Sequence, residues 1–260
     1  MVTSKPIKVK GQPIGEGKTP SIIVPLIGKT SDMVLAELNQ VLGKRPDVIE
    51  WRADFFADIG KTDAVVELAR RVKTVAGDTP LLFTIRSTEE GGQKISLTSD
   101  QVVELYSVVC RHRVADIVDY ELGNAPERVD RVRSISKETD TTMIMSYHNF
   151  QDTPSWTVLT QKFGEAAKRG ADIAKVAVMP KNLHDVLTLF AATLDANEAL
   201  PIPLISMSMG AHGLPTRLFG WVFGSAATFA VGANSSAPGQ IPIEALRQAA
   251  EVMRSGMIDE

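Results

Sequence analysis

The sequence predicts a single (β/α)₈ barrel, a closed ring of eight parallel strands in which a helix follows each strand. Two observations lead to this fold class. Patterns typical of strands and of helices alternate eight times along the chain. The chain also has 260 residues, and one barrel domain needs roughly 250.

The predicted strands are short runs of apolar residues, as expected for strands that are buried on both faces. They span residues 22–27, 48–52, 81–86, 117–121, 142–147, 173–179, 204–209 and 223–229. Residues 1–20 are polar and contain several glycines, so we predict an N-terminal arm or hairpin there. Residues 21–260 would then form the barrel domain.

Residues that favour helix starts precede or open the helical patterns between these strands. In chain order these are Ser31 or Asp32, Thr62 or Asp63, Ser99 with Asp100, Pro126, Pro154-Ser-Trp-Thr, Asn182 and Pro242. A short helix flanked by glycine is predicted over residues 214–221.

A doubly wound open sheet is the alternative fold for alternating strands and helices. Its first strand-to-helix turn usually carries a glycine-rich phosphate-binding sequence. Here that turn reads Leu26-Ile-Gly-Lys-Thr30 and has no G-x-G-x-x-G. The barrel is therefore the favoured prediction.

Composition narrows the class of protein. A net charge of −3 favours neither nucleic acid nor an anionic membrane as a partner. Cys110 is the only cysteine, so no intrachain disulfide can form and a reducing cytosol is expected. Residues 218–243 carry no formal charge, but Pro238, Gly239 and neighbouring polar residues interrupt them, so we predict no membrane span. We expect a soluble, cytoplasmic protein.

Polar residues collect at the C-terminal ends of the predicted strands, which is where barrel enzymes carry their active sites. This predicted rim holds Glu50, Arg52, Asp54, Arg86, Glu90, Asp119, Glu121, Ser146, His148, Lys175, Arg217, Ser236 and Gln240. Taken singly, several of them have a structural explanation. Glu50 with Arg52 could be an ion pair, His148 a core histidine and Met207 a gap filler. Their coincidence at one rim favours a catalytic site.

Lys175 lies in the middle of an otherwise apolar strand. Burial disfavours the charged form of a lysine, and a neutral amine can attack a carbonyl. The alternatives are a lysine paired with a carboxylate, or one whose ammonium group reaches water at the strand end. The polar residues of the same rim favour the nucleophile.

Several motifs, in this order, resemble those of type I 3-dehydroquinate dehydratase. They are Glu50-Trp-Arg52, Phe83-Thr-Ile-Arg86 with Glu90-Gly-Gly, Met145-Ser-Tyr-His148-Asn-Phe, Lys175-Val-Ala-Val-Met-Pro, Ser206-Met-Ser-Met with Arg217, Phe223-Gly-Ser-Ala-Ala-Thr-Phe and Ser236-Ala-Pro-Gly-Gln240. The resemblance implies a barrel that usually forms a homodimer and uses no metal or organic cofactor. It also implies conversion of 3-dehydroquinate to 3-dehydroshikimate and water in the shikimate pathway.

The resemblance implies a role for each matching residue. Lys175 would form an imine with the substrate, His148 would transfer protons, Glu90 would orient His148, and Arg217 would hold the substrate carboxylate. Contacts to hydroxyls and neighbouring charges would come from Glu50, Arg52, Arg86, Ser236 and Gln240. The residues that would pack on the substrate ring are Met207, Phe150, Phe229 and Ala237.

Three features depart from the family pattern. Pro25 stands where some members carry a serine that touches substrate, Asn149 stands where aspartate is frequent, and the loop 210–216 before Arg217 is unusual. None of them removes a catalytic group.

Two other functions remain possible from the sequence. Another lysine-imine barrel, such as an aldolase or transaldolase, would in many cases need a phosphate site after the last two strands, and residues 236–240 do not resemble one. A catalytically silent barrel that senses the same metabolite would be expected to have lost Lys175 or His148, and both are present.

Overall fold

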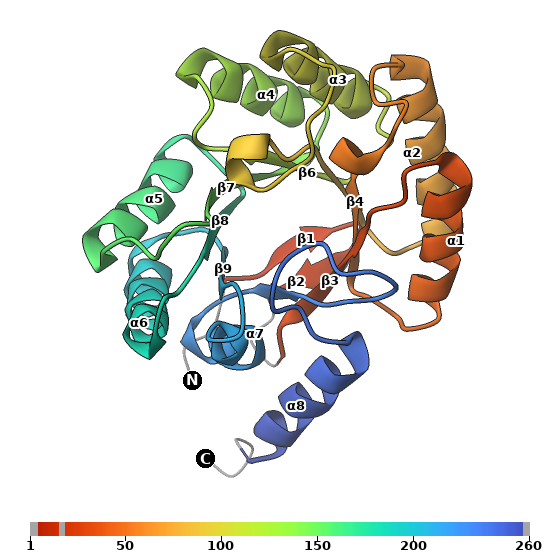
Figure 1. The fold of residues 1–260 in the computed structure, drawn as a ribbon. Coiled ribbons are helices and arrows are strands. Elements are labelled where there is room, and N and C mark those ends of the chain that lie inside the picture. Colours follow the sequence, from red (N-terminus) through yellow and green to blue (C-terminus); the bar gives the residue numbers. More distant parts are fainter. Residues whose placement is uncertain (1–4, 16–18, 257–260) are drawn as a thin grey trace.

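The computed structural model describes residues 5–15 and 19–256, and these fold as an eight-stranded barrel (Figure 1). Each strand pairs in parallel with the next one in the chain, and a bridge between Leu204 and Ser225 closes the ring. The predicted barrel is confirmed, and the doubly wound sheet is excluded because the strands follow chain order around a closed ring. The barrel strands are β3 (Ser21–Leu26), β4 (Val48–Arg52), β5 (Leu81–Thr84), β6 (Ile117–Glu121), β7 (Thr142–Asn149), β8 (Ile173–Val178), β9 (Leu204–Ser208) and β10 (Ala227–Phe229).

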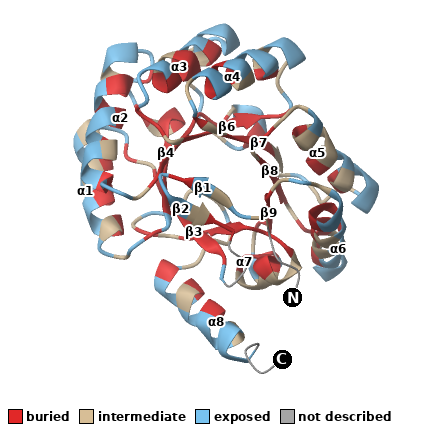
Figure 2. Ribbon diagram, turned by 180° about the vertical axis from the view of Figure 1, so that it is seen from behind, coloured by how far each residue is buried: buried red, intermediate tan, exposed pale blue. Residues whose placement is uncertain are grey.

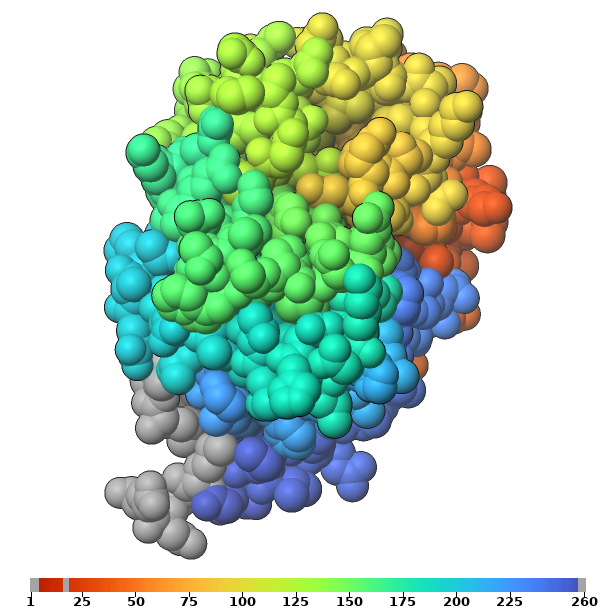
Figure 3. All heavy atoms as spheres, turned by 60° about the vertical axis from the view of Figure 1, so that its left-hand side comes forward, coloured from red at the N-terminus to blue at the C-terminus, as the bar shows by residue number. Residues whose placement is uncertain are grey.

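Helices surround the strands and bury one face each against them. Figure 2 shows this pattern as buried inner and exposed outer helix faces around a buried ring of strands. In Figure 3 the segments of α5 and α6, coloured green to cyan, form a continuous surface over their side of the barrel. The helices are α1 (Ser31–Leu42), α2 (Thr62–Ala76), α3 (Ser99–Arg111), α4 (Pro126–Glu138), α5 (Trp156–Lys168), α6 (Leu183–Ala199), α7 (Leu214–Phe219) and α8 (Ile243–Gly256).

The predicted N-terminal hairpin is present and covers one end of the barrel. Strands β1 (Ile7–Val9) and β2 (Gln12–Ile14) pair antiparallel. Val9 and Ile14 are buried in the same apolar cluster as side chains that point into the barrel. The N-terminal end of the barrel is thus filled with apolar side chains, and the opposite end is left for the site. The division of the chain at residue 20 stays a prediction.

The barrel interior changes from apolar to polar over a single step of two residues. Near the hairpin the inward-facing cluster includes Ile23, Val48, Leu82, Ile117, Ile144, Ile173 and Ile205. Successive residues of a strand alternate between faces, so the residues two positions later also point inward. These are Pro25, Glu50, Thr84, Asp119, Ser146, Lys175 and Met207. The polar layer therefore rests directly on an apolar one.

Three local predictions were wrong in detail. The last strand is shorter than predicted, because Phe223 ends a 3₁₀ helix (Gly220–Phe223) and Gly224 turns the chain with φ of 102°. Thr30, not Ser31 or Asp32, caps α1 with its side chain. Lys61 precedes α2 and gives no side-chain cap, so neither Thr62 nor Asp63 acts as one. Several cap-capable residues in a row leave the choice to the path of the preceding loop.

Other helix starts agree with the sequence. Asn182 caps α6 by accepting hydrogen bonds from the backbone amides of His184 and Asp185. Pro126 occupies the first turn of α4. Over the described part of the chain, none of the helices has both the length and the apolar character needed to cross a membrane.

Candidate active site

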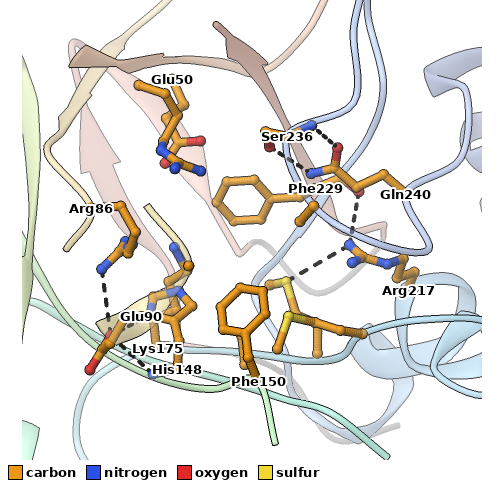
Figure 4. Close-up of a pocket in the computed structure, with 16 residues that line it drawn as sticks. Glu50, Arg86, Glu90, His148, Phe150, Lys175, Arg217, Phe229, Ser236 and Gln240 are labelled. Atoms are coloured by element: carbon orange, nitrogen blue, oxygen red, sulfur yellow. Dashed lines mark hydrogen bonds and ion pairs between the residues drawn. The ribbon is translucent and has the colours of Figure 1, made fainter. Parts of the chain in front are cut away.

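A pocket opens at the C-terminal ends of the strands, and about 470 Å³ within it, part of which is open to solvent, is not filled by protein atoms. All thirteen site residues expected from the sequence line it, together with Gly91, Ala177 and Met209. Figure 4 shows that Lys175, His148, Glu90 and Arg86 lie on one side of the pocket, and Arg217, Ser236 and Gln240 on the other. The structure thus brings the expected residues together, while their individual roles remain predictions.

Lys175 is buried on β8 but has a charged partner. Its Nζ lies 2.8 Å from Oδ2 of Asp119 on β6 and 4.6 Å from the centre of the Phe229 ring. The sequence offered a nucleophile and a carboxylate-paired lysine as alternatives. The two are compatible, because the paired ammonium group also faces the pocket.

Asp119 is fully buried and is held by three groups. Its Oδ1 accepts hydrogen bonds from Oγ of Ser146 at 2.5 Å and Nη2 of Arg86 at 2.8 Å, which leaves Oδ2 for Lys175. Burial opposes ionisation of Asp119, but Arg86 and Lys175 outweigh it and hold its pKa well below the usual range. The side chain is therefore a carboxylate at any working pH.

Arg86 binds several carboxylates at once. Its Nη1 donates to Oε1 of Glu121 at 3.2 Å and to Oγ of Ser146 at 2.9 Å, while Nη2 contacts Asp119. Burial disfavours its charge, yet these carboxylates more than offset that and raise its pKa. Arg86 therefore donates most of its N–H groups to protein side chains, and fewer remain to bind a substrate hydroxyl.

His148 ends up next to Glu90 because a 3₁₀ helix (Thr88–Glu90) brings the carboxylate to the end of β7. Oε2 of Glu90 lies 2.7 Å from Nδ1 of His148 and accepts its backbone N–H at 3.1 Å. The next residue, Gly91, has φ of 84°, and a Cβ there would come within 2.2 Å of the Phe150 ring. This turn therefore requires glycine.

The environment of this pair changes both pKa values. Burial, and then the positive charges of Arg86 and Lys175, hold the pKa of His148 well below its ordinary value, so the imidazole is neutral. Burial and the charge of Glu121 raise the pKa of Glu90 to about 8. If Nδ1–H donates to Glu90, Nε2 keeps a lone pair and His148 can act as a base.

Arg217 is buried without a carboxylate partner among the residues that the structure describes. Its hydrogen bonds go to the carbonyl of Pro238 at 3.0 Å, the carbonyl of Phe229 at 3.4 Å and Sδ of Met207 at 3.9 Å. Its Nε is buried without a hydrogen-bond acceptor. Burial lowers its pKa to about 10, so the side chain remains charged near neutral pH. An uncompensated buried cation is a natural site for an anionic ligand group.

The loop that carries Ser236 and Gln240 is closed on itself. Nε2 of Gln240 donates to Oγ of Ser236 at 3.1 Å, and the Ser236 backbone N–H donates to Oε1 of Gln240 at 3.0 Å. Gly239 has φ of 78°, and a Cβ there would lie 2.4 Å from the carbonyl oxygen of Gly210. The loop thus packs closely beside Arg217, at the mouth of the pocket.

Glu50 and Arg52 do not form the ion pair that the sequence suggested. Arg52 instead binds Asp54 through two hydrogen bonds of 2.8 Å, and Glu50 accepts a hydrogen bond from Oγ1 of Thr84 at 2.9 Å. Both side chains nevertheless line the pocket.

The three departures from the family pattern lie in different local settings. Pro25 lies two residues beyond Ile23, the last residue of β3 that pairs with β10. Asn149 ends β7 in a turn, where its Oδ1 accepts the backbone N–H of Gln151 and of Asp152. In the loop 210–216, Thr216 receives a hydrogen bond from the Ser208 backbone and donates to Gly213.

Sequence reasoning placed Asp119 and Ser146 at the rim but did not include them among the site residues. Both belong to the inward-facing polar layer that contains Lys175. A search for inward positions two residues beyond an apolar layer would have found them. Among the described residues, no group of three or more His, Cys, Asp or Glu side chains could hold a metal ion.

Comparisons with known proteins identify the family of this chain. A 3-dehydroquinate dehydratase from Albidiferax ferrireducens is 55% identical over 259 residues, which are 100% of this chain and 98% of the relative. The crystal structure of 3-dehydroquinate dehydratase from Geobacillus kaustophilus matches with a TM-score of 0.95 at 46% identity, covering 98% of each chain. The type I enzyme from Clostridium difficile, solved with covalently modified comenic acid, matches with a TM-score of 0.93 at 35% identity, covering 97% of this chain and 99% of that one. The sequence profile named type I 3-dehydroquinase matches residues 22–257, and the chain belongs to that family.

Proposed function

We propose that this chain converts 3-dehydroquinate to 3-dehydroshikimate and water through an imine on Lys175. Family membership carries the enzyme class, a hydro-lyase of the 3-dehydroquinate dehydratase type. One observation supports the mechanism above all others. A single pocket holds a buried lysine, a neutral histidine and a guanidinium group to which the described part of the chain offers no carboxylate partner.

The pocket suits a substrate that carries both a carboxylate and a ketone. Arg217 supplies the positive charge for the carboxylate and Lys175 the amine for the ketone. Since the two lie on opposite sides of the pocket (Figure 4), the substrate would bridge them. Glu50, Ser236 and Gln240 add polar groups that can meet ring hydroxyls.

The proposed chemistry begins when the Lys175 ammonium passes a proton to the neutral His148 and its amine adds to the ketone; His148 then returns that proton to the carbinol oxygen. Loss of water then leaves a protonated imine, which acts as an electron sink. His148 takes the proton from the α-carbon, and the electron pair of that C–H bond moves toward the imine nitrogen. The resulting enamine expels the β-hydroxyl, to which His148 returns the proton as water leaves. Hydrolysis of the imine then frees the product and Lys175.

Each rival function meets an obstacle in the pocket. Many sugar-phosphate aldolases would need a phosphate site after β9 and β10, and residues 236–240 there do not resemble one. A silent sensor would not need a lysine and a histidine that both face the ligand pocket.

The direct test is to incubate the purified protein with 3-dehydroquinate and follow the ultraviolet absorbance of the conjugated enone product. We expect the absorbance to rise with wild-type protein and to stay flat with Lys175→Ala. An unchanged absorbance with folded wild-type protein would contradict the proposed reaction.

We also propose that the chain forms a homodimer, as the family resemblance implies. We propose the cytoplasm as its location because a chain with one cysteine suits a reducing compartment. The one cysteine, Cys110, is buried, and burial raises the pKa of its thiol to about 11, so it is an unreactive core residue. Light scattering during size-exclusion chromatography would decide the oligomeric state, and a mass of one chain would contradict the dimer.

A further inference from the structure

Asp119 is the only carboxylate within 4.0 Å of the Lys175 ammonium among the residues that the structure describes. It lies on β6, two strands away from Lys175 on β8, and Ser146 lies on β7 between them. Its Oδ1 is bound by Ser146 and Arg86, so Oδ2 has a fixed direction toward Nζ. A buried carboxylate held in this way can do more than neutralise a resting lysine.

We infer that Asp119 is a positioning residue for the reaction, the counter-ion that keeps the imine nitrogen of Lys175 protonated during elimination. This inference rests on the proposed imine. The imine accepts electrons from the breaking C–H bond only while its nitrogen carries a proton and a positive charge. An anion fixed beside that nitrogen stabilises the charged form and needs no reorganisation when the charge appears.

The surroundings favour this role over a purely structural one. Arg86 already contacts Glu121 and Ser146, and it approaches Glu90 at 3.7 Å. Its charge would therefore stay compensated without Asp119. Lys175, by contrast, contacts no other carboxylate within 4.0 Å in the described residues. Loss of Asp119 would thus leave the reacting nitrogen without a counter-ion while leaving Arg86 paired.

Glu121 offers a matched control. It lies on the same strand, two residues after Asp119, is also buried and also binds Arg86, but it forms no ion pair with Lys175 within 4.0 Å. Asp119→Asn and Glu121→Gln each remove one negative charge from the same cluster with little change in shape. Both variants weaken the pairing of Arg86, so a loss seen in Asp119→Asn and not in Glu121→Gln does not come from Arg86.

The experiment measures kcat and the trapping of Lys175 by cyanoborohydride, which reduces protonated but not neutral imines, across a range of pH. We expect Asp119→Asn to lower kcat about 10²–10³-fold, the usual effect of removing one preorganised charge-stabilising group. Its trapping should fail at a pH about 1–3 units lower than in wild type, since an opposite charge at this distance has an effect of that size. Glu121→Gln should lower kcat less and keep the wild-type pH limit of trapping.

The outcomes separate the two proposals. If wild-type protein gives no adduct on Lys175 at any pH, the imine mechanism fails. If wild type is trapped but Asp119→Asn keeps the wild-type kcat and pH limit, or Glu121→Gln matches its losses, the role of Asp119 is overturned. Should circular dichroism show Asp119→Asn unfolded, Ser146→Ala tests the same role by releasing Oδ1. That variant should show a smaller shift of the pH limit in the same direction, and no shift would refute the inference.

Discussion

The two sides of the pocket handle buried charge in opposite ways. Around Lys175, the cations bind carboxylates on β6: Lys175 binds Asp119, and Arg86 binds Asp119 and Glu121. Around Arg217, the described residues provide only carbonyl oxygens and a thioether. The cations of the first side are paired with carboxylates before substrate arrives, and, among the described residues, the cation of the second side is not. This difference assigns proton and electron movement to the Lys175 side and capture of an anion to the Arg217 side.

The largest expected loss of turnover comes from Lys175→Ala, on the side of the pocket where the cations are paired with carboxylates. Without the amine no imine can form, so turnover should fall by more than about 10⁴-fold, as when other enzymes lose their nucleophile. Borohydride added during turnover should label wild type but not this variant, as read by peptide mass spectrometry. The exposed Lys61 serves as a control, and Lys61→Ala should behave as wild type. Labelling of a lysine other than Lys175 would refute the assignment.

His148→Ala should separate the steps on this same side. General acid–base catalysis accelerates a step by about 10²–10⁴-fold. Removal of a residue that serves several steps should therefore lower kcat by more than one such factor. Lys175 remains a nucleophile, so a covalent adduct should still form slowly. It should persist, because the variant lacks the histidine that would assist hydrolysis of the imine. Intact-protein mass spectrometry without borohydride would detect it. An adduct that turns over at the wild-type rate would show that His148 is only structural.

Arg217→Ala tests the side of the pocket where the cation has no carboxylate partner among the described residues. Arg86→Ala, on the opposite side, is the contrasting variant. Loss of the carboxylate contact at Arg217 should lower kcat/KM about 30- to 3,000-fold, which corresponds to about 2–5 kcal/mol. Because Arg217 has no acidic partner among the described residues, its loss leaves no unpaired carboxylate there, and the free energy of unfolding should change little. Arg86→Ala strips buried carboxylates of their partner and should lower that free energy by about 3–5 kcal/mol. Urea unfolding of both variants, with kinetics of Arg217→Ala, checks the comparison. Equal destabilisation would contradict it.

The smallest expected effect is a change in pH dependence from Glu90→Gln. Glu90 has a pKa of about 8, so it is mostly protonated below that pH and negative above it. The negative form stabilises the imidazolium and makes His148 a stronger base, so wild-type kcat/KM should rise through about pH 8. Each unit by which the pKa of His148 rises should increase kcat/KM by at most about tenfold. Glu90→Gln cannot ionise, and its profile should lack this rise. A rise of equal size in the variant would place the titration elsewhere.

Much of this site could be predicted from residue patterns alone. Alternation of strand and helix patterns is enough for a barrel, and the barrel rule puts the strand ends at one rim. Period two along each strand then places Glu50, Arg52, Asp119 and Lys175 inward. These inferences succeed because they depend on local periodicity and on a rule that holds for the whole fold.

Local signals failed where several residues could serve equally well. Thr30, Ser31 and Asp32 can all cap a helix, and the path of the loop from β3 selects Thr30. The apolar run before Phe229 also resembled one long strand. Gly224, with φ of 102°, ends the preceding 3₁₀ helix, and the strand covers only Ala227–Phe229.

The sequence by itself determined the barrel, the family and which side chains reach the pocket. Only the tertiary structure decided which charges meet. Lys175 and Asp119 are 56 positions apart and pair because β6, β7 and β8 stand side by side in a set register. Arg217 stays without a carboxylate because the described residues around it offer carbonyl oxygens instead. Coulomb energy depends on distances of a few ångströms, and those distances exist only once the barrel has closed.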